Sequence, residues 1–274
     1  MTAMRFLAAL LVSLLIVACA SPTPASAPAS PASTATDDAG STEVSADATA
    51  DSEEQVLSPP SPPAPSEPRV VTLDGDVRVD VAAGTVSFPG TIALDEGWLE
   101  VGVCRAGTRE HEAVVVTGST PSIVHAGLLL AGLEPGKPGG YHANGSAFGP
   151  TGDRVVVELQ PLDDAGAPAG DPIPFASTVL DVRSPEEVPD LGWVFAGSQV
   201  LPNPPSMGPG EYYAADFGGS LIGLSTFGDE VVGAIEVRSP DSGVDDAVWK
   251  IRPGVLPAAG TRVRVVVTRS PERP

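Results

Sequence analysis

The sequence predicts an α+β domain built mostly from antiparallel β-strands, with one main buried helix at about 120–132 and a disordered tether before it. Short segments of alternating apolar and polar residues recur from Val70 onward, and this is the periodicity of half-buried strands. One longer apolar segment instead carries the start and stop signals of a helix. Glycine and proline, 30 of each in 274 residues, separate these segments and indicate frequent turns. One helix among many short strands is typical of the α+β class.

The first residues, 1–18, have the pattern of a signal peptide. Arg5 is their only charge, and it precedes an almost uninterrupted apolar run from Phe6 to Ala18. This run is shorter than the roughly 20 residues that a membrane-spanning helix needs, and it has the length of a signal-peptide apolar region. Cys19 follows directly, in an arrangement that resembles the lipobox of bacterial lipoproteins. The resemblance implies cleavage before Cys19 and lipidation of its thiol; ordinary secretion with an incidental cysteine is the alternative.

Such an anchor would place the protein in the cell envelope, bound to a membrane. Two or three acyl chains hold a membrane far more firmly than a single chain. The residue after the cysteine is Ala20, and not aspartate. By analogy with Gram-negative lipoproteins, this favours attachment to the outer membrane, facing the periplasm. The chain has two cysteines, so lipidation of Cys19 would leave Cys104 without a disulfide partner in the chain.

Residues 19–69 are predicted to form a lipidated, disordered tether that is acidic and rich in proline, alanine and serine. From 20 to 68 the chain contains no lysine, arginine or aromatic residue. Such a composition buries too little apolar surface to offset the entropy of ordering. Residues 70–274 are long enough for one core and are predicted to form a single domain. The formal net charge of −20 argues against nucleic acid as a partner.

In the first half of the domain, strands are predicted at 77–81 and 85–88, and Pro89-Gly90 should end the second. The segments 98–104 and 112–117 are predicted to pair as an antiparallel hairpin around a turn at Gly107 and Thr108. Further strands are predicted in the second half, at 154–159, 178–182, 193–200, 212–217, 221–227 and 262–268.

The predicted helix begins at Thr120 and Pro121, a hydroxyl at the N-cap followed by proline at the first helical position. Residues 123–131 are apolar almost all round, which predicts a buried helix, and Gly132 should end it. The glycine-rich segment 136–140 that follows lacks the strand and helix that flank a phosphate-binding loop. It is therefore predicted to be a surface loop.

Short motifs throughout the domain match a known pattern: Phe88-Pro89, Leu99-Glu100-Val101, Cys104, Gly107-Thr108, Glu110-His111-Glu112, Pro121, His125, and Ala131 to Gly136. They resemble the YdjY-like family of exported bacterial proteins. The stretches 193–198 and 213–224 also resemble the longer version of that family seen in planctomycetes. Some members carry a ferredoxin-like label, but one free cysteine cannot ligate an iron–sulfur cluster, which takes about four thiolates.

The candidate functional cluster consists of Cys104, His111, Glu112 and His125. In the predicted hairpin Cys104 lies opposite His111, with the two Cβ atoms about 5 Å apart, and an imidazolium there would lower the pKa of the thiol. Glu112 falls on the apolar face, where a carboxylate must be paired or neutral. His125, on the helix, would pack back over the hairpin.

Three interpretations of this cluster stay open. In a structural role, Cys104 is a small buried residue and the two histidines bond to backbone carbonyls. In the same role, Glu110 or Glu112 pairs with Arg105 or Arg109 across the turn. In a metal site, Cys104, His111 and His125 with Glu112 would offer ligands for zinc, copper or iron, although no cofactor is predicted. In a third role, Cys104 is a nucleophilic thiol activated by histidine. Because no catalytic set is complete, we expect a non-catalytic protein that binds an envelope protein or a small ligand; the alternative is a metal-binding or redox/thiol enzyme.

Overall fold

The structure is a computed structural model that describes residues 70–271. The predicted signal peptide 1–18, the lipidation site Cys19 and the predicted tether 19–69 lie outside the described residues. Everything described belongs to one compact unit that spans Ser61–Pro274. This unit holds the whole of the core considered below.

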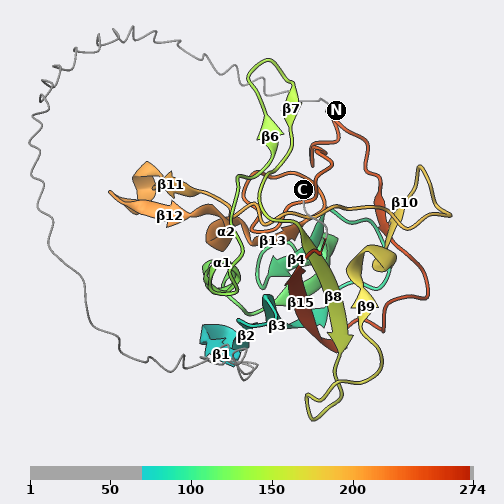
Figure 1. Ribbon diagram of the computed structural model, residues 1–274. Coiled ribbons are helices and arrows are strands. Elements are labelled where there is room, and N and C mark those ends of the chain that lie inside the picture. The colour runs from blue at the N-terminus through green and yellow to red at the C-terminus, as the bar shows by residue number, and fades with distance from the viewer. Residues whose placement is uncertain (1–69, 272–274) are drawn as a thin grey trace, which may run out of the picture. The chain divides into compact units, whose positions relative to one another are not determined.

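A nine-stranded, mostly antiparallel sheet forms the centre of the unit (Figure 1). Its path runs β13–β4–β5–β3–β15–β8–β9, and β2 and then β1 extend it beside β3. The strands of this sheet are β1 (Val70–Leu73), β2 (Val77–Asp80), β3 (Thr85–Ile92), β4 (Val101–Arg105), β5 (Ala113–Thr117), β8 (Val155–Pro161), β9 (Ile173–Pro174), β13 (Ser220–Gly223) and β15 (Arg262–Arg269). The mostly antiparallel α+β class is therefore confirmed.

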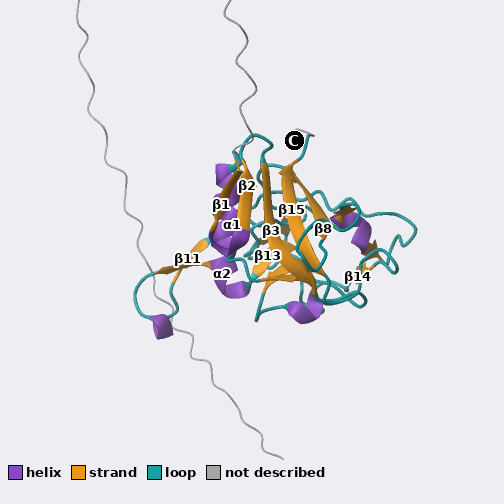
Figure 2. Ribbon diagram, turned by 90° about the horizontal axis from the view of Figure 1, so that it is seen from below, coloured by secondary structure: helices purple, strands orange, loops and turns teal. Residues whose placement is uncertain are grey.

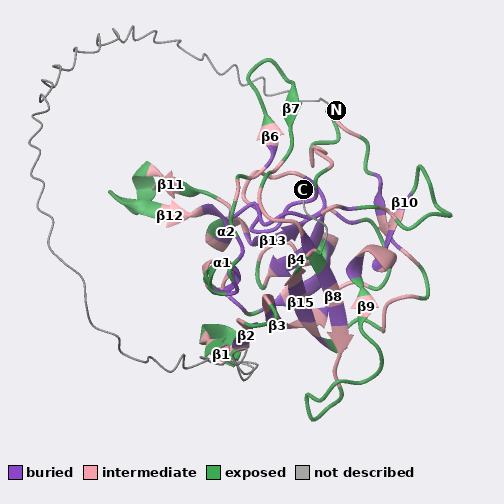
Figure 3. Ribbon diagram, in the orientation of Figure 1, coloured by how far each residue is buried: buried purple, intermediate pink, exposed green. Residues whose placement is uncertain are grey.

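The smaller elements lie around this sheet. Three further pairs of strands are antiparallel: β6 (Gly140–Tyr141) with β7 (Ala147–Phe148), β10 (Val179–Asp181) with β14 (Trp249–Ile251), and β11 (Val200–Pro202) with β12 (Glu211–Tyr213). The helices are α1 (Pro121–Leu130) and α2 (Ala214–Gly218), with single 3-10 turns η1 (Asp74–Asp76), η2 (Glu110–Glu112), η3 (Phe175–Thr178) and η4 (Pro205–Met207). Figure 3 shows that buried residues gather in the large sheet, whereas much of β6–β7 and β11–β12 is exposed.

Strand β3 does not end at Pro89-Gly90 as the sequence predicts, but continues to Ile92. It pairs with β15 from Thr85 to Thr91. The carbonyl of Pro89 instead accepts a hydrogen bond from Thr117 Oγ1 at 2.6 Å on the other side. The amide and carbonyl of one strand residue point the same way, so the missing N–H of Pro89 faces away from β15. Proline therefore removes no bond from that ladder.

The predicted hairpin of 98–104 with 112–117 is wrong, because β4 and β5 are neighbours that run parallel. Cys104 lies opposite Val116 in this register, and not opposite His111. The chain returns between the two strands through η2. Each strand has only five residues, so the return path is about 13 Å long at ~3.3 Å per residue. A link much shorter than an ordinary crossover helix is enough to span it.

The predicted helix at about 120–132 is confirmed as α1, but it is buried on one face only. Gly127 lies against Val77, Val79 and Val86, where an added Cβ would come within 3.2 to 3.4 Å of their methyl groups. On the opposite face the last turn leaves Leu129 and its neighbour exposed. The helix therefore covers the β2–β3 part of the sheet with the face that carries Val124, Gly127 and Leu128.

The N-terminus of α1 is capped by a residue distant in sequence. Thr120 occupies the N-cap, but its side chain makes no capping hydrogen bond. Asp216 Oδ1, on α2, instead accepts the backbone N–H of Ser122 at 2.8 Å. Figures 1 and 2 show α1 and α2 side by side. A carboxylate at this end also interacts favourably with the helix dipole.

Replacing Asp216 by alanine is expected to lower the free energy of unfolding by about 1 kcal/mol, the usual effect of removing a helix cap. Urea unfolding of the wild type and the variant measures the difference. Thr120→Ala is the matched control, since its hydroxyl makes no cap bond. A larger loss in Thr120→Ala than in Asp216→Ala would show that the cap has been assigned to the wrong residue.

Two predicted strands in the second half have other structures. The segment 212–217 divides into β12 and α2, and most of 193–200 lies outside any strand until β11 begins. Along 193–198 the backbone bonds alternately to two neighbours: Phe195 N–H donates to Asp153 O, and Gly197 N–H donates to Val231 O. This segment is therefore wedged between β8 and the 230–233 segment, and it forms no continuous ladder with either.

Candidate functional site

Cys104 is buried, with none of its surface exposed. Its apolar neighbours are Val101 and Ala113, with Val116 and Phe227 packed beside them. Burial raises the pKa of the Cys104 thiol to about 11, so the sulfur carries a proton near neutral pH. This environment is that of a small structural hydrophobe and disfavours a thiolate nucleophile.

His111 and Glu112 lie on the surface turn η2, away from the cysteine's register partner. The His111 side chain is 78% exposed, and its Nε2 is 3.6 Å from Glu112 Oε2. Glu112 is also 3.7 Å from Arg109 Nη1, while the Arg109 guanidinium lies over the Phe227 ring, 3.7 Å from its centroid. Glu112 is therefore half-buried and takes part in ionic contacts within the β4–β5 link.

His125 is held on α1 by a different set of contacts. Its Nδ1 is 2.7 Å from the hydroxyl of Tyr213, and that hydroxyl donates to Gly197 O at 3.0 Å. Since the phenol proton goes to the carbonyl, Nδ1 must donate to the phenol oxygen. The ring also meets Phe195 edge to face, with centroids 4.9 Å apart. Burial lowers the pKa of His125, which favours a neutral imidazole in this packing.

The four predicted site residues thus occupy three different environments. Cys104 lies in the core, the η2 pair lies on the surface, and His125 joins α1 to β12. Within residues 70–271, no group of three or more histidine, cysteine, aspartate and glutamate side chains is placed to hold a metal ion. The part of the chain that the structure describes also holds no helix both long and apolar enough to cross a membrane.

A cluster of carboxyl groups that was not predicted lies near the end of β13. Glu230 is 2% exposed, and its carboxyl group accepts the backbone N–H groups of Phe227 and Gly228. Burial raises the pKa of Glu230 to about 7, and burial also raises the pKa of Asp229 beside it. One feature of the sequence indicates this burial: Glu230 directly precedes two apolar residues, Val231 and Val232.

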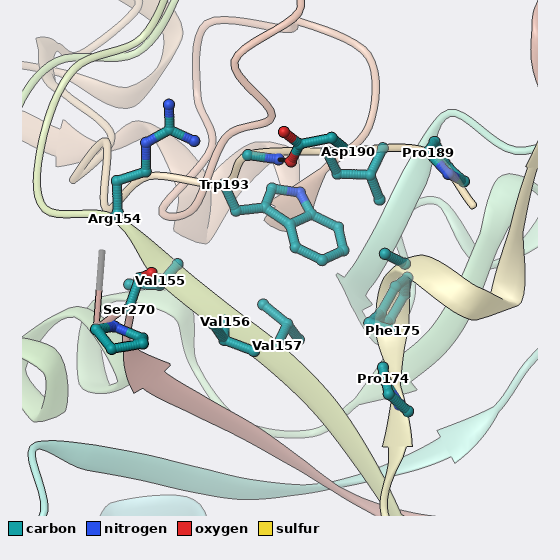
Figure 4. A pocket seen from close by; sticks show the side chains of 14 residues that line it. Arg154, Val155, Val156, Val157, Pro174, Phe175, Pro189, Asp190, Trp193 and Ser270 are labelled. Atoms are coloured by element: carbon teal, nitrogen blue, oxygen red, sulfur yellow. Dashed lines mark hydrogen bonds between the residues drawn. The ribbon is translucent and has the colours of Figure 1, made fainter. Parts of the chain in front are cut away.

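A cleft lies beside β8 and is called the β8 cleft below (Figure 4). Its volume is about 320 Å³. The lining comes from β8, the start of η3, the 189–193 loop and the end of β15: Arg154, Val155, Val156, Val157, Pro174, Phe175, Ala176, Pro189, Asp190, Leu191, Gly192, Trp193, Ser270 and Pro271. Most of these side chains are apolar.

The inner wall of the β8 cleft is fixed in place by its own contacts. The rings of Phe175 and Trp193 meet edge to face, with centroids 5.2 Å apart. Trp193 Nε1 donates to Gly223 O at 3.0 Å, so the indole has no unsatisfied donor. Val155 N–H bonds to Trp193 O at 3.0 Å and joins this wall to β8. The cleft is therefore formed before any ligand arrives.

One end of the β8 cleft carries its charged groups. Arg154 lies there (Figure 4), and its Nη1 is close to Gly192, in the loop that also contains Asp190. Asp190 Oδ1 accepts the N–H of Gly192 at 3.1 Å, which fixes the loop. Gly192 has a positive φ of 51°, and an added Cβ would lie 2.8 Å from Arg154 Nη1. The positive φ and the close approach of both Ile235 and Arg154 favour glycine at this position.

Comparison with known families identifies one match. A family model described as the YdjY domain matches residues 77–268, which is well over half of the chain and includes every residue that lines the β8 cleft except Ser270 and Pro271. Neither the curated proteins nor the solved structures include a match to this chain.

Proposed function

This chain belongs to the YdjY domain family, and we propose that its domain is a non-catalytic binding module of the cell envelope that takes up a small, largely apolar ligand in the β8 cleft. The observation that carries the proposal is the cleft itself. Its volume of about 320 Å³ falls in the range of ligand pockets, roughly 300–1,000 Å³. An apolar, preformed wall with a few polar groups at one end is the usual composition of such a pocket.

Binding of a neutral fluorescent probe tests the cleft. N-phenyl-1-naphthylamine is apolar and brightens on leaving water, and we expect residues 61–274 to bind it. Val156, in β8, is 42% exposed and lines the cleft. Val156→Asp should weaken probe binding at least ~10-fold, because the apolar probe would then meet a charge that must lose water.

Val200→Asp is the matched control for this experiment. Val200 is another exposed strand valine, 60% exposed, and it does not line the cleft. The Val200→Asp variant should bind the probe with the affinity of the wild type. Equal loss in both variants, or undiminished binding in Val156→Asp, would contradict the proposed site. Circular dichroism of each variant establishes that the fold is kept.

The second part of the proposal concerns where the protein is located in the cell. The signal-peptide pattern before Cys19 supports lipidation of this cysteine and attachment to a membrane, with the outer membrane favoured by Ala20. The long acidic segment 19–69 would then separate the domain from the lipid surface. In this arrangement the β8 cleft meets ligands in the periplasm.

Metabolic labelling with palmitate tests the anchor. The wild-type chain should take up label and sediment with membranes, whereas Cys19→Ser should lose both properties, because no other thiol can replace the one at the cleavage point. Cys104→Ser serves as the control and should label fully, since Cys104 is buried in the core. Equal label in wild type and Cys19→Ser would exclude the lipid anchor.

A further inference from the structure

We propose that the ligand of the β8 cleft carries an anionic group at one end of an apolar body, and that Arg154 binds this group. The inference rests on the proposed function, because it assigns the chemical class of the ligand that the same cleft takes. The two halves of the ligand correspond to two regions of the lining. Valine, proline, phenylalanine and tryptophan side chains supply the apolar region, and Arg154 supplies the only cationic group among the lining residues.

Arg154 differs from every other arginine that the structure describes. Each of the others donates its guanidinium to a carboxylate or to a backbone carbonyl. Within residues 70–271, the guanidinium of Arg154 makes no hydrogen bond, ion pair or aromatic contact. In a chain with a formal charge of −20, acidic partners are plentiful, so a guanidinium left without one stands out.

The neighbouring acid does not neutralise Arg154. Asp190 also lines the cleft, but its carboxylate accepts the N–H of Gly192 and forms no ion pair with Arg154. The guanidinium instead lies close to the glycine loop, with Nη1 2.8 Å from the position that a Cβ at 192 would take. Arg154 is thus positioned by packing while its donors stay available for a ligand.

Guanidinium is suited to this task because its planar fork matches the two oxygens of a carboxylate, or two of a phosphate. Its site is half-buried, at the end of an apolar cleft, where water competes less than on an open surface. The expected ligand is therefore a small amphiphile, such as an acid with an alkyl or aryl body. A neutral ligand of the same shape would leave the charged end of the cleft without a partner.

A pair of probes that differ only in the charged end tests this inference. Octanoate and 1-octanol have the same apolar chain, and both are titrated against N-phenyl-1-naphthylamine bound to residues 61–274. Arg154→Gln should weaken octanoate ~10-fold, the size expected for loss of one charge-assisted contact. The same variant should bind 1-octanol within about twofold of the wild type.

Lys137→Gln is the matched charge control. Lys137 is exposed, has no ion pair in the described part of the chain, and does not line the β8 cleft. Lys137→Gln removes one positive charge outside the cleft and should leave the affinities for octanoate and 1-octanol unchanged. A similar loss of octanoate in this variant would show that net charge, and not a specific contact, governs binding.

The outcomes separate this inference from the proposed function. If both probes displace the dye and Arg154→Gln affects neither, the cleft binds ligands but the assignment of Arg154 is wrong. If Arg154→Gln weakens both probes equally, Arg154 shapes the cleft and does not recognise charge, which also overturns the inference. If the wild type binds neither the probes nor the dye, the proposed function itself fails.

Discussion

Glu230→Gln should be more stable than the wild type at pH 8 by about 3 kcal/mol, and the difference should vanish at pH 4. In the folded chain burial raises the pKa of Glu230 from 4.5 to about 7. The neutral carboxyl group is thus favoured by folding. The neutral carboxyl group's contribution to the free energy of unfolding is fully present below pH 4.5 and is lost as the pH rises through 7. The loss amounts to about 1.4 kcal/mol per unit of pKa difference. Glutamine has no charge to bury and keeps an oxygen that accepts the two N–H groups.

Urea unfolding of both proteins at several pH values between 4 and 8 measures this divergence. Other groups titrate in the same range, so the quantity to follow is the difference between the two curves. Glu186→Gln is the control, because Glu186 is an exposed glutamate and its replacement should reproduce the wild-type profile. Parallel curves for wild type and Glu230→Gln would show that the buried group bears no charge penalty.

Gly152→Ala should lower the free energy of unfolding by ~3 kcal/mol or more. Gly152 precedes β8 and has a positive φ of 129°, and an added Cβ would lie 2.0 Å from the carbonyl oxygen of Phe195. Both the backbone strain and the collision with another backbone must then be relieved by movement of the chain. The same carbonyl accepts the N–H of Gly136 at 2.9 Å, so its movement would break a bond as well.

Gly166→Ala separates the two causes. Gly166 also has a positive φ, 82°, but an added Cβ would meet nothing within 4 Å. It should lose only about 1 kcal/mol, the cost of a left-handed conformation for alanine. Thermal unfolding monitored by circular dichroism compares the two. If Gly152→Ala lowers the free energy of unfolding no more than Gly166→Ala does, the 193–196 segment moves aside at little cost, which would contradict the prediction.

Gly152→Ala should also weaken binding of the naphthylamine probe. The 193–196 segment that meets Gly152 is continuous with Trp193, whose ring forms the inner wall of the β8 cleft. A displaced backbone there would shift the indole. This second readout connects a packing contact outside the cleft with the proposed binding.

Much of the fold follows from local pattern. The strands at 77–81, 154–159 and 262–268 follow from strand-like apolar patterns, and the helix follows from its start and stop signals. The error at β4 and β5 has a physical cause, since a short link between two strands ordinarily makes a hairpin and a parallel pair ordinarily needs a long crossover. Very short strands remove that requirement, and strand length cannot be read from the alternation alone.

The contacts that were missed join residues far apart in the chain. The cap of α1 comes from Asp216. Where β3 continues past Pro89, the carbonyl of this proline accepts a hydrogen bond from Thr117. Glycine-rich 136–140 was predicted to be a surface loop, yet an added Cβ on Gly136 would lie 2.1 Å from the backbone of Thr151. In such cases the residue type records a tertiary contact whose partner the local sequence does not identify.

The candidate site shows the same division. Burial of Cys104 is one of the interpretations made from the sequence, whereas its distance from His111 depended on a register that only the parallel pairing reveals. The β8 cleft draws its lining from four separate segments. No motif marks it, because its chemistry is an ordinary set of apolar residues with one arginine.

The position of β15 has a consequence for the order in which the protein matures. This strand, the last along the described chain, lies between β3 and β8 and pairs with both. Until the ribosome has made it, no strand of the described chain pairs with both β3 and β8. Contacts across such long sequence separations form slowly. Under the proposed export, a nascent chain whose sheet waits for β15 would remain unfolded enough to pass through a translocation channel.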